Sequence, residues 1–148
     1  MAYCIRRKDS KAQASLRRIA REQVQAAIRG IDTAAVDPAG AIHDVRKRIK
    51  KIRGLLRLVR ASFDGYRNEN AAFRAIAAPL GPKRDADVLI DTFDRVVGTA
   101  GTADADMFAP VRQRLVQHGE AVEAAQDPDA LLRAARAALQ DALLRIPA

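Results

Sequence analysis

The stretch IHDVRKRIKKIRGLLRLVR, residues 42–60, has the most regular pattern in this chain. Successive residues of a helix are rotated by about 100°, so residues three and four apart share one side. One side of this stretch is apolar and consists of Ile42, Val45, Ile49, Ile52, Leu56 and Val59. The opposite side carries His43, Arg46, Lys47, Lys50, Arg53 and Arg57. The stretch therefore predicts one helix with a core-facing stripe and a cationic stripe back to back.

The positive charge of the chain is concentrated in its first 60 residues. The 148 residues carry a net charge of +8, and residues 43–60 hold eight Lys or Arg against one Asp, a balance of +7. Residues 1–30 contribute +6, residues 31–42 contribute −2 and residues 61–148 contribute −3. Clustered positive charges repel one another and raise the free energy of the folded state. We therefore expect a polyanionic partner that binds these charges. The alternative is an ordinary solvated helix face.

The rest of the chain also has helical spacing. Apolar residues recur every three or four positions in segments near 16–31, 68–80, 83–97, 108–125 and 129–146, and no stretch alternates as a strand does. Loops are expected at 32–40 and 98–106, with a bend at 79–82. We expect an all-α protein, an antiparallel helical bundle of about five or six helical segments. It would be a single domain over residues 10–148 behind a flexible lead over residues 1–9.

Composition points to one cellular compartment. No apolar run approaches the ~18 residues of a membrane span, and the N-terminus lacks the long apolar segment of a secretory signal. Cys4 is the single cysteine, so no disulfide can form within the chain. These features predict a cytoplasmic protein that does not associate with membranes.

Two short patterns resemble a known family. His43-x-x-Arg46 is followed by Lys50-Lys51-x-Arg53, and residues 80–88 read LGPKRDADV. In this order, the patterns resemble the CHAD family, the conserved histidine α-helical domain, over residues 10–146. Members look like two similar helical bundles that face each other across a basic groove, each with one histidine-bearing helix. His118 is not followed by an arginine three residues later, so the resemblance implies one half of such a domain.

The resemblance implies binding of inorganic polyphosphate, association with polyphosphate granules and no catalysis. Polyphosphate is a linear polyanion without bases, which arginines can bind bidentately while lysines act as adaptable point charges. The residues expected to bind it are His43, Arg46, Lys47, Lys50, Lys51, Arg53, Arg57, Lys83 and Arg84. The alternative for His43 is a helix cap or a core position.

No cofactor, metal ion or catalytic residue is expected. The sequence offers no Ser, His and Asp arrangement and no Cys and His cluster at metal-ligand spacing. Asp85, Asp87, Asp91 and Asp94 could in principle gather Mg²⁺, but the first two are explained by the first turn of a helix. An accessory to a metal-dependent phosphohydrolase is therefore kept only as an alternative.

Nucleic acid is the other alternative partner. The cationic face lacks amide, hydroxyl and aromatic side chains that would read or stack bases, so only non-specific backbone binding is expected.

A homodimer is expected because a single open row of cations makes weak, screened contacts with an anion. In a two-fold dimer the helices over residues 43–57 would face each other across a shared basic channel. The apolar contact of this dimer is expected elsewhere, on the C-terminal helix with Leu131, Leu132 and Leu139.

Overall fold

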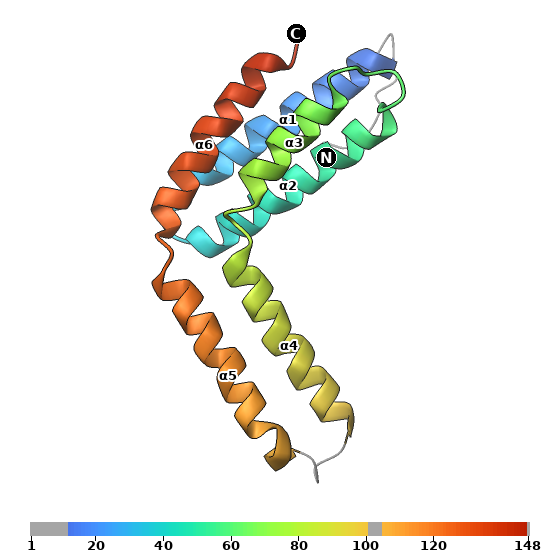
Figure 1. The fold of residues 1–148 in the computed structure, drawn as a ribbon. Helices are drawn as coiled ribbons and strands as arrows, with labels where there is room; N and C mark the ends of the chain where they lie inside the picture. The colour runs from blue at the N-terminus through green and yellow to red at the C-terminus, as the bar shows by residue number, and fades with distance from the viewer. Residues whose placement is uncertain (1–11, 101–104, 148) are drawn as a thin grey trace. The chain divides into compact units, whose positions relative to one another are not determined.

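Six helices make up the described part of the chain (Figure 1). The computed structural model describes residues 12–100 and 105–147. The helices are α1 (Ala12–Asp32), α2 (Pro38–Leu58), α3 (Tyr66–Ala77), α4 (Pro82–Ala100), α5 (Ala105–Ala124) and α6 (Pro128–Arg145). These residues contain no strand, so the all-α prediction is confirmed. The predicted lead over residues 1–9 lies outside the described residues.

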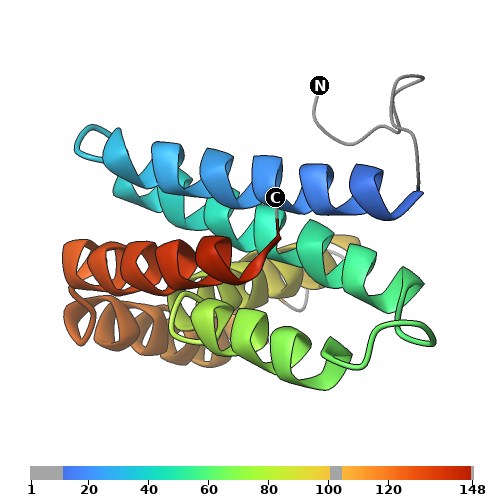
Figure 2. The ribbon, with the colours of Figure 1, turned by 90° about the horizontal axis from the view of Figure 1, so that it is seen from above.

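The helices form two compact units. The first contains α1, α2, α3 and α6, and the second contains the hairpin of α4 and α5. Within the first unit, α2 lies between α1 and α3, and α6 packs mainly against α1 (Figure 2). None of the helices in residues 12–100 and 105–147 combines the length and the apolar composition that a membrane span requires.

The apolar stripe of α2 builds the core of the first unit. Val45, Ile49 and Ile52 are at most 1% exposed, as the spacing predicts. The other helices of the unit contribute buried side chains as well, among them Val24, Ala27, Phe73, Leu132 and Leu139. Leu55 is also buried, although the spacing placed it outside the stripe. Leu55 lies seven residues after Arg48 and therefore on the same side of α2. Because Nη1 of Arg48 donates a hydrogen bond to Oε1 of Gln23 in α1, this side of α2 faces α1, and the buried side of α2 extends toward α1.

α2 begins earlier than the sequence predicted. The expected loop ran to Gly40, but the helix starts at Pro38 and ends at Leu58. Asp37 is the cap, because its Oδ1 accepts the backbone N–H of Gly40 at 2.8 Å. Pro38 has no N–H of its own and suits the first helical position. Because the helix begins at Pro38, every residue of the cationic stripe lies within α2.

Replacing Asp37 with Ala should lower the free energy of unfolding by about 1 kcal/mol, because the Gly40 N–H loses its acceptor. Asp37→Asn keeps a side-chain oxygen and should unfold like the parent chain. Thermal unfolding followed by circular dichroism measures both variants. Equal losses for Ala and Asn would contradict the capping role.

A ring pair and an ion pair are among the contacts between α4 and α5. The rings of Phe93 and Phe108 lie 6.4 Å apart and nearly perpendicular. Arg112 donates two hydrogen bonds to the carboxylate of Asp94, at 2.8 and 2.9 Å. The hydrogen bond from Arg112 lowers the pKa of Asp94 below its usual value. The stabilisation that this ion pair contributes is therefore fully present at pH values above the usual pKa of Asp. It is lost as the pH falls through the lowered pKa of Asp94.

The sequence misplaced the end of α4. The helix continues through Gly98 to Ala100, so the predicted loop over residues 98–106 begins too early. Val88, Leu89 and Val96 have the apolar character of core residues but are 40%, 48% and 62% exposed. Helical spacing identifies an apolar side of α4 but does not show whether anything covers it.

Candidate anion-binding face

The cationic side of α2 points away from the core of the first unit. Its exposed members are His43, Lys47, Lys50 and Arg57, and its half-buried members are Arg46 and Arg53. They lie opposite Val45 and Ile52, which anchor the helix. The predicted back-to-back arrangement of α2 is therefore present.

Arg53 joins this side of α2 to α3. Its Nε donates a hydrogen bond to Oδ1 of Asn70 at 2.9 Å. A guanidinium has five N–H donors, so this bond leaves capacity to bind anionic oxygens. The bond also identifies the flank of α3 that adjoins the cationic side of α2.

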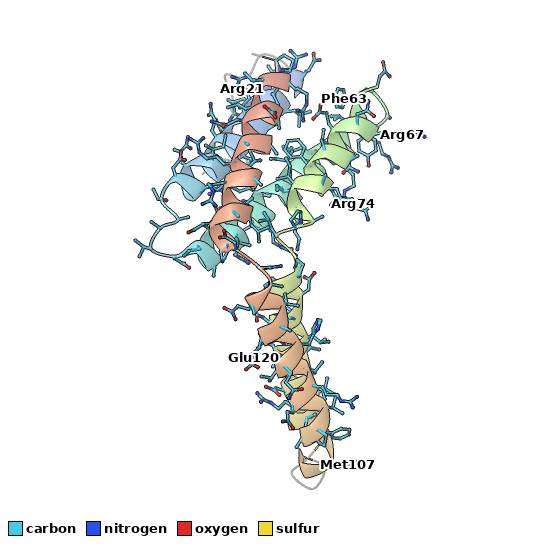
Figure 3. The ribbon with its side chains drawn as sticks, turned by 60° about the vertical axis from the view of Figure 1, so that its left-hand side comes forward. Arg21, Phe63, Arg67, Arg74, Met107 and Glu120 are labelled. Carbon is cyan, nitrogen blue, oxygen red and sulfur yellow. The ribbon has the colours of Figure 1, made fainter. Side chains whose placement is uncertain are left out.

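α3 adds two arginines that the sequence analysis did not include. Arg67 precedes Asn70 by three residues and Arg74 follows it by four, so all three share one side of α3. Both arginines are exposed, and Figure 3 shows them on the same edge of α3. The spacing was visible in the sequence, but only the packing of α3 on α2 shows which cations it adjoins.

α2 and α3 run antiparallel, so the position of each α3 cation along the helix axis can be matched to a residue of α2. With Arg53 opposite Asn70, Arg67 lies near the level of Arg57, and Arg74 lies near the level of Lys50. We call the resulting surface the basic face: Arg46, Lys50, Arg53 and Arg57 of α2 with Arg67 and Arg74 of α3. From Arg46 to Arg57 it spans about 16 Å of helix axis at 1.5 Å per residue.

The carboxylates of α2 and α3 lie on other sides of these helices. Asp44, the single acid of α2, pairs with Arg48 on the flank toward α1. Glu69, the single acid of α3, accepts two hydrogen bonds from Arg145 of α6, at 2.8 and 3.1 Å. The hydrogen bond to Glu69 raises the pKa of Arg145. Neither acid therefore lies among the cations of the basic face.

Five predicted site residues are not among the six that define the basic face. His43 and Lys47 are exposed on α2 but farther around the helix from α3, and half-buried Lys51 lies on the flank toward α1. Lys83 and Arg84 stand in the first turn of α4, in the second unit. A part for these five residues in anion binding stays a prediction.

The aspartates of α4 do not gather into a metal site. Within residues 12–100 and 105–147, no group of three or more His, Cys, Asp or Glu side chains could hold a metal ion. Asp94 is instead paired with Arg112. The geometry therefore adds no support to the alternative of a metal-dependent phosphohydrolase accessory.

Comparison with known proteins identifies the family. The family model of the CHAD domain matches residues 12–148. This chain belongs to the CHAD domain family. The resemblance carried by residues 43–53 and 80–88 is thereby confirmed, and CHAD domains are associated with polyphosphate binding. No curated protein and no solved structure matches this CHAD chain.

Proposed function

We propose that this CHAD chain binds inorganic polyphosphate along the basic face and catalyses no reaction on it. The supporting observation is that six Lys and Arg side chains from two adjacent helices share one surface with no carboxylate of either helix among them.

The chemistry of the basic face suits a linear polyanion. Two rows of cations, one on each helix, offer repeated charge-assisted hydrogen bonds, which are the bonds that a chain of phosphates accepts. Five of the six side chains are arginines, whose planar guanidinium can bind two phosphate oxygens at once. Such a surface extends along the helices and fits a polymer better than a single phosphate.

We extend the proposal to polyphosphate granules in the cytoplasm. A binder that does not degrade or synthesise the polymer accumulates where the polymer is concentrated. The association of the CHAD family with polyphosphate supports this location.

Nucleic acid is the competing ligand, because its backbone carries the same charge. The basic face provides little to recognise a base. The six residues that define it are all Lys or Arg, and the amide side chain beside them, Asn70, is engaged with Arg53. A protein that reads or stacks bases needs such groups.

A competition titration tests the proposal. Fluorescent RNA or DNA is bound to the chain and then displaced with long-chain polyphosphate, with ATP as a short-chain control, all at equal phosphate concentration. We expect polyphosphate to displace both nucleic acids, ATP to displace little, and affinity to fall steeply with salt as counterions are released. If RNA or DNA instead displaced polyphosphate more readily than the reverse, the assignment of the ligand would be wrong.

A further inference from the structure

A pocket in the first unit takes no part in the proposed function. It lies between α1 and the residues that follow α6, and its volume is about 410 Å³. Its lining includes Arg17, Arg18, Arg21 and Glu22 of α1, with Pro147 beyond the end of α6. We call it the arginine pocket. Its volume lies in the range of pockets that hold small molecules, about 300 to 1,000 Å³.

The arginine pocket and the basic face lie on different sides of the first unit. Over the described residues, α1 contacts α2 and α6 but not α3, whereas the basic face is shared by α2 and α3. The flank of α2 toward α1 carries the ion pair of Arg48 with Asp44 rather than the cations of the basic face. An anion in the arginine pocket would therefore occupy a separate site.

α6 places its apolar side in the core and its end against α1. Leu132 and Leu139 are 3% and 0% exposed, so they cannot form the apolar dimer contact that the sequence suggested, and that expectation is wrong. Past the end of the helix, the carbonyl of Ile146 accepts a hydrogen bond from Nη1 of Arg21 at 2.6 Å (Figure 3). This bond holds one wall of the arginine pocket against α1.

The three arginines of the pocket lie within about one turn of α1. Arg21 follows Arg17 by four residues and Arg18 by three, and side chains at these spacings are neighbours on a helix. Like charges at these spacings destabilise the helix. Glu22 accepts a hydrogen bond from Arg18 at 3.0 Å and offsets one of the three charges. The described lining therefore keeps two positive charges.

The guanidinium groups keep N–H donors for a further anion. All three are half-buried. Arg18 and Arg21 each use Nη1 in the bonds given above, and a guanidinium has five N–H donors. Within residues 12–100 and 105–147, no hydrogen bond or ion pair engages Arg17. Partial burial of a charged group without an acceptor is unfavourable, and a bound oxyanion supplies acceptors.

A phosphate group matches the charge and the donors of this pocket. At pH 7 a terminal phosphate carries about −1.5 to −2, close to the two positive charges of the lining, and it has three acceptor oxygens. Two arginines can bind such a group bidentately at the same time. Ala14 and Pro147 add apolar surface beside the arginines, which suits a small organic substituent.

We propose that the arginine pocket binds the phosphate group of a small phosphate compound, inorganic phosphate or a phosphomonoester, through Arg17, Arg18 and Arg21. From Arg17 to Arg21 the cluster spans about 6 Å of helix axis at 1.5 Å per residue. That length suits one phosphate group, whereas the basic face suits a polymer. The inference holds or fails separately from the proposed function.

The test measures the binding of inorganic phosphate and of glycerol 3-phosphate to the full chain by isothermal titration calorimetry, with sodium chloride keeping the ionic strength constant. Arg17→Ala removes one guanidinium from the pocket. Arg29→Ala is the matched control, because Arg29 is exposed on the same helix and does not line the pocket. We expect Arg17→Ala to weaken the binding of both compounds about tenfold and Arg29→Ala to leave it unchanged. Without phosphate, both variants should melt like the parent chain.

NMR spectra of the arginine side chains give a second measurement on the parent chain. Inorganic phosphate should shift the Nε–H resonances of Arg17 and Arg21 and leave that of Arg29 in place. Tighter binding of glycerol 3-phosphate than of inorganic phosphate would identify a phosphomonoester as the ligand, and equal binding would identify free phosphate.

A variant of the basic face keeps the two sites apart. The chain with Ala at positions 57, 67 and 74 should bind both phosphate compounds as the parent chain does. Loss of their binding in this variant would place them on the basic face and overturn the proposal. A parent chain that binds neither compound overturns it as well, as does equal weakening by Arg17→Ala and Arg29→Ala.

Discussion

Replacing Arg57, Arg67 and Arg74 together with Ala should weaken the binding of long-chain polyphosphate by up to about 100-fold. The three side chains lie on the basic face, and each exposed ion pair with a phosphate contributes up to about 1 kcal/mol. Because 1.4 kcal/mol is a factor of about ten, three such contacts account for a loss of that size. The salt dependence of binding should also become shallower, by about one unit of slope for each lost contact.

A matched variant separates a surface effect from an effect of net charge. Arg29, Arg95 and Arg133 are also exposed arginines, and none belongs to the basic face. Replacing these three with Ala removes the same charge and should change the affinity much less. Isothermal titration calorimetry and the melting temperature should be measured for both variants. Equal weakening by the two would mean that polyphosphate responds to total charge and that the basic face is not the site.

Replacing Ile52 with Ala should lower the free energy of unfolding by about 2 to 5 kcal/mol. Ile52 is 1% exposed, so truncation removes buried apolar surface and leaves a cavity between the helices of the first unit. Ile49, which is equally buried, should show a loss of the same order. Urea denaturation followed by circular dichroism measures the change.

The control for this core prediction lies on the same helix. Lys47 is exposed on the opposite side of α2, and Lys47→Ala should change the free energy of unfolding by no more than about 0.5 kcal/mol. If Lys47→Ala were as destabilising as Ile52→Ala, the assignment of the two sides of α2 would be wrong.

α2 shows which structural features local sequence patterns predict and which they do not. Its two opposite sides could be predicted from spacing alone, since both follow from the rotation between successive residues of a helix. Its start was misplaced, because Asp37 followed by Pro38 resembles a loop until the cap to Gly40 is seen. The cap is a contact between a side chain and a backbone N–H, and residue spacing does not reveal it.

Three properties could be predicted from the sequence alone: the helical class of this protein, its membership of the CHAD family through two short patterns, and the cationic side of α2. These are properties of residues close together along the chain. The extension of that cationic side by Arg67 and Arg74 depends on tertiary packing, because the pairing of α2 with α3 selects which flanks adjoin. Tertiary packing is also the reason that Leu132 is buried while Leu89 is exposed. The spacing of apolar residues is alike in α4 and α6, but burial depends on the neighbours that each helix meets, and those neighbours come from distant parts of the chain.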